Sequence, residues 1–124
     1  MKTIAVLGAS LDRSKYGNKC VRAYQAAGYK VYPIHRSESE VEGTKAYPSL
    51  AECPKPLERI SVYLPPPVTL HYLPEIQEAG AEQVWFNPGS ADEAVLEEAR
   101  RLGIPAHPYC SIVDVGYSPS QFPG

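Results

Sequence analysis

Short apolar runs recur along the chain and are separated by stretches with helical periodicity. The runs lie at residues 3–7, 30–34, 59–64, 83–87 and 104–107. Between them, apolar residues spaced three or four positions apart precede Gly28, Gly80 and Gly103, which are expected to end helices. Strands therefore alternate with helices about five times. This alternation predicts an α/β protein with a parallel sheet, right-handed crossovers and helices on both faces.

Two S-x-x-E sequences predict where helices begin. Ser49 is followed by Glu52, and Ser90 is followed by Glu93. In this capping box each side chain accepts a hydrogen bond from the backbone N–H of the other residue. The first is expected to start only a short helix.

The pattern predicts one doubly wound, Rossmann-like domain over residues 1–124, with a five-stranded sheet in the order 3-2-1-4-5. A chain of 124 residues has the usual size of one domain. Ligands of such sheets bind at the carboxyl ends of the strands where the order reverses, here between the first and fourth strands. A turn-rich tail is expected from about 111 to 124, and its last part, 118–124, is expected to fray.

The end of the first strand is typical of a phosphate-binding turn. Gly8 follows the strand, and Gly17 lies where the next helix begins. Backbone N–H groups at a helix N-terminus attract anions, and Arg13 and Lys15 add positive charge. The dinucleotide fingerprint G-x-G-x-x-G is absent because position 10 is serine, so the ligand need not be NAD. A loop that merely connects strand and helix is the alternative.

The second strand ends with Pro33, His35 and Arg36. An NAD enzyme presents an acidic residue to the ribose at this place, whereas a guanidinium suits a ribose phosphate. We therefore expect Arg36 to contact a phosphate, with His35 as a second donor. Solvated polar residues at a strand end are the alternative.

Two further strand ends offer apolar and polar turns. Leu64 precedes three prolines, 65–67, which mark the end of a strand and a stiff extended path. An adenine ring or a pantetheine arm can lie on such a ledge, although a rigid connection explains it equally well. The turn Asn87-Pro88-Gly89 is expected to face the same crevice as Gly8.

Composition narrows the classes of partner. The net charge of −2 gives no broad basic field, which argues against nonspecific nucleic-acid binding. No apolar run is long enough to span a bilayer, and the N-terminus lacks the pattern of a signal peptide. The three cysteines have no paired spacing. We expect a soluble cytoplasmic protein with no nucleic-acid or membrane partner.

Taken together, six segments resemble the small stand-alone CoA-binding protein family in order and spacing. The segments are Gly8-Ala-Ser10, Lys15-Tyr-Gly17, Val31-Tyr-Pro-Ile34, Gly43 to Leu50, Leu64-Pro-Pro66 and Val84 to Gly89. That family has a Rossmann-like domain similar to the nucleotide-binding domain of the succinyl-CoA synthetase alpha subunit. The resemblance covers nearly the whole chain and implies coenzyme A, or an acyl-CoA, as ligand.

The strand ends and the resemblance together give the expected cofactor-binding residues. They are Gly8, Ala9, Ser10, Arg13, Ser14, Lys15, Tyr16, Gly17, Pro33, His35, Arg36, Leu64, Pro65, Pro66, Phe86, Asn87, Pro88 and Gly89. The resemblance implies that the first loop meets the CoA phosphates. Cys110 is a candidate contact for the pantetheine thiol, with a buried inert cysteine as the alternative.

The expected function is a noncatalytic CoA-binding module that serves as a sensor or carrier. The synthetases that share this domain use a phosphorylated histidine and an ATP-grasp partner, and the sequence marks neither, nor any catalytic triad. No catalytic residue and no metal site are therefore predicted. An NADP-dependent oxidoreductase, a component of an acyl-CoA ligase, and a structural partner for another chain are the alternatives. A homo-oligomer or a partner protein stays open.

Overall fold

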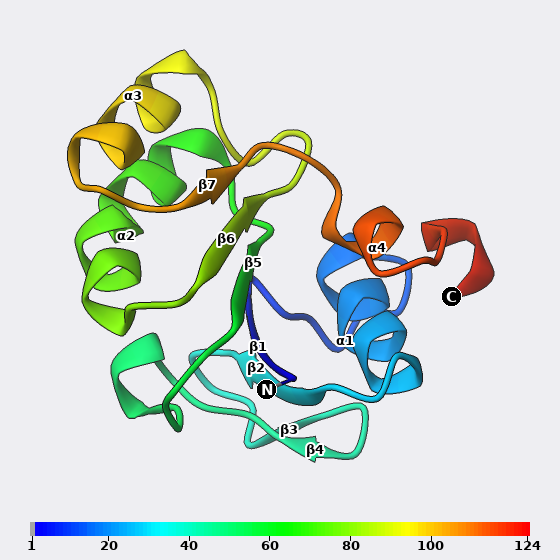
Figure 1. Ribbon diagram of the computed structural model, residues 1–124. Helices are drawn as coiled ribbons and strands as arrows, with labels where there is room; N and C mark the ends of the chain where they lie inside the picture. The colour runs from blue at the N-terminus through cyan, green and yellow to red at the C-terminus, as the bar shows by residue number, and fades with distance from the viewer. Residues whose placement is uncertain (1) are drawn as a thin grey trace.

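Alternating strands and helices build a parallel sheet with helices on both faces, as the sequence predicts (Figure 1). The computed structural model describes residues 2–124. The strands are β1 (Thr3–Leu7), β2 (Lys30–Ile34), β3 (Glu40–Val41), β4 (Thr44–Lys45), β5 (Arg59–Val62), β6 (Gln83–Phe86) and β7 (Ala106–His107). The helices are α1 (Tyr16–Ala26), α2 (Pro66–Ala79), α3 (Glu93–Arg101) and α4 (Ser111–Asp114), with short 3-10 turns η1 (Leu50–Glu52) and η2 (Pro119–Gln121).

The main sheet has five parallel strands in the order β2-β1-β5-β6-β7, which confirms the doubly wound class. When Tyr47, which forms a parallel bridge beside Ile34, is counted as a third strand at the edge of the sheet, the order by position in the chain becomes 3-2-1-4-5-6. The predicted order 3-2-1-4-5 is equivalent to the first five places of this series. The run at 59–64, expected to be that third strand, instead forms β5 and takes the fourth place beside β1. The point where the order reverses therefore lies between β1 and β5, not between β1 and β6.

The two faces of the sheet bury separate sets of side chains. In β1, Ala5 and Leu7 pack toward α2 and α3, whereas Ile4 and Val6 pack toward α1 and α4. Figure 1 shows these two helical layers on opposite sides of the sheet. All four side chains are buried, since a central parallel strand is covered on both faces.

Several element boundaries differ from the prediction. Pro65 is the extended N-cap residue of α2, and Pro66 and Pro67 form the first helical turn rather than an extended path. Proline is tolerated there because the first N–H groups of a helix have no partner within the helix. The N-cap of α3 is Asp92, whose side chain accepts from the Val95 N–H, so the predicted capping box at Ser90 is wrong.

The other capping box is also absent, although the short helix that it predicts is present as η1. Ser49 makes no side-chain cap hydrogen bond there. Its hydroxyl lies 3.4 Å from the Glu52 carboxylate instead. At the helix ends, Gly28, Gly80 and Gly103 all have positive φ and end their helices as predicted.

The turn-rich segment from about 111 to 124 packs against α1. It contains α4 and η2, and η2 begins with a complete capping box between Ser118 and Gln121. Lys19 Nζ donates to the Phe122 carbonyl at 2.7 Å, and Arg22 donates to the same carbonyl at 2.9 Å. Two cations of α1 thus hold the last residues of the chain beside the first loop.

Candidate functional site

Two glycines at the end of β1 allow three backbone segments to meet. A Cβ atom at Gly17 would lie 2.2 Å from the Gly8 carbonyl oxygen. A Cβ atom at Gly8, where φ is +97°, would lie 2.5 Å from the Tyr63 carbonyl oxygen. Real side chains cannot come so close to backbone atoms. The glycines therefore bring the first turn of α1 and the end of β5 against the end of β1.

A cleft of about 430 Å³ opens at this junction, and we call it the loop cleft. Most of its lining residues come from the ends of β1, β5 and β6 and from the start of α1. They are Gly8, Lys15, Tyr16, Gly17, Tyr63, Leu64, Pro65, Pro66, Pro88, Gly89 and Ser90. The first N–H groups of α1 have no partner within the helix, so the cleft offers backbone donors to an anion.

A second hollow, of about 190 Å³, adjoins the loop cleft and shares Gly8 and Leu64 with it. We call it the Arg36 hollow. Its other lining residues come from β1, from the end of β2, from the segment before η1 and from α2. They are Leu7, Ala9, Ile34, His35, Arg36, Pro48, Ser49, Tyr72 and Glu75.

A third hollow, of about 240 Å³, adjoins the loop cleft on the other side and contains Cys110. Tyr16, Tyr63 and Pro88 are common to both, and Asn87 and Pro119 complete its lining. We call it the Cys110 hollow. The three hollows thus follow one another along the carboxyl edge of the sheet, from Arg36 to Cys110.

These hollows are lined by two cationic side chains without a partner in the described chain. Within residues 2–124, the side chains of Lys15 and Arg36 make no ion pair and no hydrogen bond with protein groups, and both residues are exposed. Lys15 lines the loop cleft and Arg36 lines the second hollow. Each cation is therefore free to bind an anionic group of a ligand.

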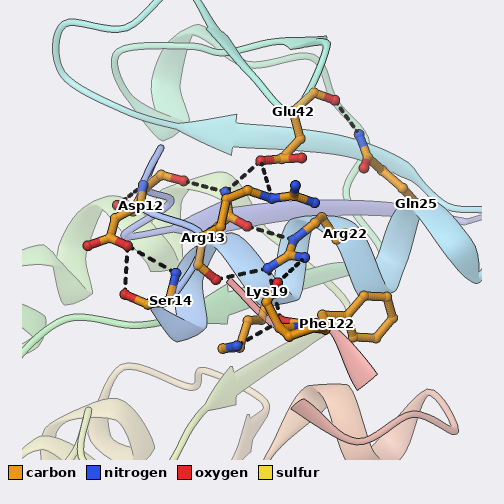
Figure 2. Close-up of polar contacts among 11 residues, drawn as sticks. Asp12, Arg13, Ser14, Lys19, Arg22, Gln25, Glu42 and Phe122 are labelled. Atoms are coloured by element: carbon orange, nitrogen blue, oxygen red, sulfur yellow. Dashed lines mark hydrogen bonds and ion pairs between the residues drawn. The ribbon is translucent and has the colours of Figure 1, made fainter. Parts of the chain in front are cut away.

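The remainder of the first loop is held by internal contacts, as Figure 2 shows. Arg13 Nε lies 3.5 Å from the Glu42 carboxylate, so its charge is partly neutralised. The Ser14 hydroxyl donates to Asp12 at 2.6 Å, and Ser10 Oγ accepts from the Asp12 N–H at 3.0 Å. These three predicted ligand residues, Ser10, Arg13 and Ser14, do not line the hollows but maintain the shape of the loop.

Contacts with the β3–β4 hairpin also stabilise the conformation of the first loop. The buried Asn18 of α1 donates through Nδ2 to the Ser10 carbonyl and to Glu42 Oε2, both at 2.9 Å. Glu42 itself has a positive φ of 50°. Asn18 and Glu42 thereby connect the loop, α1 and the hairpin, although they are far apart in the sequence.

Asn87 lies at the edge of the Cys110 hollow, but its side chain belongs to a buried network. Asn87 Nδ2 donates to Ser61 Oγ at 2.8 Å and to the Val62 carbonyl at 2.9 Å. Asn87 Oδ1 accepts from the Ser111 N–H at 2.9 Å. Since Ser111 follows Cys110 directly, the network fixes the position of that cysteine. Phe86 and Pro33, two other predicted ligand residues, are buried in the sheet away from the hollows.

The cysteines have different environments. Cys20 is fully buried, and this burial raises the pKa of its thiol to about 11. Burial also raises the pKa of the Cys53 thiol. Cys110 is partly exposed and lines a hollow. A high pKa keeps the thiols of Cys20 and Cys53 protonated and unreactive. Cys110 is the accessible candidate for thiol chemistry because it is partly exposed.

Some residues that line the hollows are not among those predicted from the sequence. Tyr72 and Glu75 reach the Arg36 hollow from the middle of α2, and Pro119 reaches the Cys110 hollow from η2. A helix interior and a late turn carry no local ligand signal. Tyr63 was detectable, because it directly precedes the Leu64-Pro65 strand end.

Residues 2–124 contain no metal-binding cluster. No three His, Cys, Asp or Glu side chains gather closely enough to hold a metal ion. Two side chains that could ligate a metal have other partners: Asp114 pairs with Arg59 at 2.8 Å, and His107 stacks on Trp85 with ring centroids 4.7 Å apart.

None of the helices within residues 2–124 has the length and apolar character required to cross a membrane.

Comparison with known proteins gives consistent matches. Residues 2–116 match a family described as CoA binding domain. The chain is 36% identical over 112 residues to the alpha subunit of acetate–CoA ligase [ADP-forming] II from Pyrococcus furiosus, a match that covers 86% of the chain but 24% of that subunit. It is 28% identical to the uncharacterized protein YneT of Bacillus subtilis, with 82% of the chain and 76% of YneT covered.

A solved structure extends this similarity to the fold. A conserved hypothetical protein from Pyrococcus furiosus superposes with a TM-score of 0.84 and 33% sequence identity. The match covers 92% of this chain and 99% of that protein. The domain thus also occurs as a separate small protein.

Proposed function

The chain belongs to the CoA binding domain family, and on this premise we propose that it binds coenzyme A or an acyl-CoA as a noncatalytic module, used as a sensor or carrier. One observation carries the proposal: the three hollows form a series along the carboxyl edge of the sheet, with unpaired Lys15 and Arg36 beside two of them. CoA is a long ligand with phosphates at two separate places, which suits this arrangement.

The parts of CoA correspond to the hollows in order. The ribose 3′-phosphate is placed at Arg36, whose planar guanidinium can form two hydrogen bonds to it. The diphosphate is placed at the start of α1 beside Lys15. The pantetheine arm then passes Pro65 and Pro88 toward Cys110. Other predicted ligand residues line the same path: Gly8, Ala9, Tyr16, Gly17, His35, Leu64, Pro66 and Gly89.

The environments of the three histidines support a noncatalytic role. His35 Nδ1 accepts hydrogen bonds from the N–H groups of Ser37 and Glu38, at 3.2 and 3.0 Å. His107 stacks on Trp85, and His71 lies exposed on α2. Within residues 2–124, none of them is paired with a carboxylate in the way that phosphorylated or general-base histidines usually are.

A component of an acyl-CoA ligase is the second candidate, because the chain is 36% identical to part of an ADP-forming acetate–CoA ligase subunit. In that case a separate chain would supply the catalytic groups. Copurification with an ATP-binding subunit, and acyl-CoA synthesis by the resulting complex, would favour this candidate over a stand-alone module.

Calorimetry with CoA, 3′-dephospho-CoA and NADPH tests the proposal. We expect saturable CoA binding that Lys15→Ala and Arg36→Ala each weaken by about tenfold or more, because each removes at least one charge-assisted hydrogen bond. Arg36→Ala should leave the affinity for 3′-dephospho-CoA unchanged, since that ligand lacks the contacted phosphate. Lys30→Ala, at the opposite end of β2, is the control. Binding of NADPH that CoA does not displace would favour an oxidoreductase instead.

Cys110 is expected to form a mixed disulfide when the protein is incubated with CoA disulfide. The Cys110 thiolate attacks one sulfur of CoA disulfide, forms a Cys110–CoA disulfide and releases one CoA thiolate. Intact-mass spectrometry should show one CoA adduct on the wild type and on Cys53→Ser, and none on Cys110→Ser. An equal adduct on Cys110→Ser would contradict a thiol contact at this hollow.

A further inference from the structure

The lining of the Arg36 hollow contains a carboxylate as well as the Arg36 guanidinium. Its walls include the apolar side chains of Ile34, Leu64 and Tyr72, which suit the faces of a flat ring. Glu75 of α2 is the only acidic residue in the lining. The hollow therefore presents a carboxylate from α2 and cationic or donor groups from the end of β2.

The end of β2 contributes hydrogen-bond donors to the Arg36 hollow, as the hydrogen bonds of His35 indicate. Because His35 Nδ1 accepts two backbone N–H groups, that nitrogen carries no proton, and Nε2 bears the hydrogen of the neutral ring. His35 and Arg36 thus both offer donors, which suit the sugar phosphate. Glu75, from α2, is the charged acceptor in the lining and can take a hydrogen bond from a base.

The Glu75 carboxylate is incompletely paired. Its Oε2 atom is buried and has no hydrogen-bond partner within residues 2–124. The carboxylates of Glu42, Glu98 and Asp114, by contrast, all have cationic partners. The Glu75 carboxylate therefore has unused hydrogen-bonding capacity, and a ligand N–H group that reaches it from the hollow gains an acceptor.

We propose that Glu75 makes this hollow selective for a 6-aminopurine by accepting a hydrogen bond from the exocyclic amino group of adenine. The inference rests on the proposed CoA function, in which Arg36 holds the ribose phosphate. The amino group of adenine lies at the edge of the base away from the ribose, and it supplies the missing donor. A 6-oxopurine places an acceptor oxygen at the same position, which the carboxylate repels.

The experiment compares CoA with its hypoxanthine analogue, deamino-CoA, by calorimetry on three proteins. Wild type should bind CoA about tenfold or more tightly than deamino-CoA, the ratio expected for one hydrogen bond to a charged acceptor. In Glu75→Gln the ratio should fall to about threefold or less, since the amide can donate to the 6-oxo group. Glu78→Gln, an exposed residue one turn further along α2, makes the same charge change and should keep the wild-type ratio.

The outcomes separate the inference from the function on which it rests. A ratio that Glu75→Gln leaves unchanged would overturn the role of Glu75, even if the variant binds both ligands more weakly, because Glu75 would then contact the sugar or serve only the fold. Equal binding of the two ligands by wild type would overturn it as well, with CoA binding intact. Failure of wild type to bind CoA at all would overturn both proposals.

Discussion

Gly17→Ala is expected to weaken CoA binding by at least about a hundredfold, through loss of two or more hydrogen bonds to the diphosphate. Within a helix, alanine is ordinarily favoured over glycine by about 1 kcal/mol. Here the added Cβ would lie 2.2 Å from the Gly8 carbonyl oxygen, which belongs to the backbone at the end of β1. The clash outweighs the helical preference, because it can be relieved only by moving α1 away from the sheet.

The same substitution should lower the free energy of unfolding by about 1–3 kcal/mol, the usual cost of overpacking. Calorimetry measures the binding, and urea denaturation measures the stability. Gly28→Ala is the matched control: φ there is +84°, and nothing lies within 4 Å of the added atom. It should cost about 1 kcal/mol of stability by backbone strain and leave CoA affinity unchanged. Normal CoA binding by Gly17→Ala would show that the contact between α1 and β1 does not shape the site.

Asn87→Leu is expected to reduce the free energy of unfolding by about 3 kcal/mol or more. Leucine is similar in size but cannot hydrogen bond. The Ser111 N–H and the Val62 carbonyl, which Asn87 binds at 2.9 Å each, would lose a buried partner. Each unpaired buried group costs about 1–3 kcal/mol. Urea denaturation followed by circular dichroism measures the change.

Ser90→Ala is the control for Asn87→Leu, because it removes a single hydrogen bond from the same turn. The Ser90 hydroxyl donates to the Asn87 carbonyl at 2.7 Å, and its loss should cost only about 1 kcal/mol. If Asn87→Leu proved no more destabilising than Ser90→Ala, the buried network would contribute little to the fold. The turn at Asn87 would then be free to act mainly as a ligand contact, as the sequence suggests.

The prediction of fold class succeeded because it depends on local periodicity. Apolar runs of the right length, and the glycines that end the helices, lie within a few residues of the structure that they specify. The assignment of the run at 59–64 to the third place in the sheet failed for a different reason. The neighbour of a strand depends on which face its connecting segment crosses, and here Tyr47 takes that place beside Ile34.

The prediction of site residues was informative where a residue follows a strand directly. Gly8, Arg36 and Pro65 were identified in this way, and all three line the hollows. The environment of Arg13, by contrast, depends on a distant segment of the chain. Its charge suggests a phosphate contact, but Glu42 of the hairpin, 29 positions later by sequence number, lies 3.5 Å away.

The sequence alone determined the parallel sheet, the loop after β1 and the chemical character of the strand ends, because these depend on neighbouring residues. Only the tertiary structure decided which polar groups stay available to a ligand. It paired Arg13 with Glu42, buried the Asn87 side chain against the Ser111 N–H, and brought Glu75 from α2 to the hollow of Arg36. Each contact joins segments far apart in the chain, so it depends on how the helices and strands pack and not on local sequence.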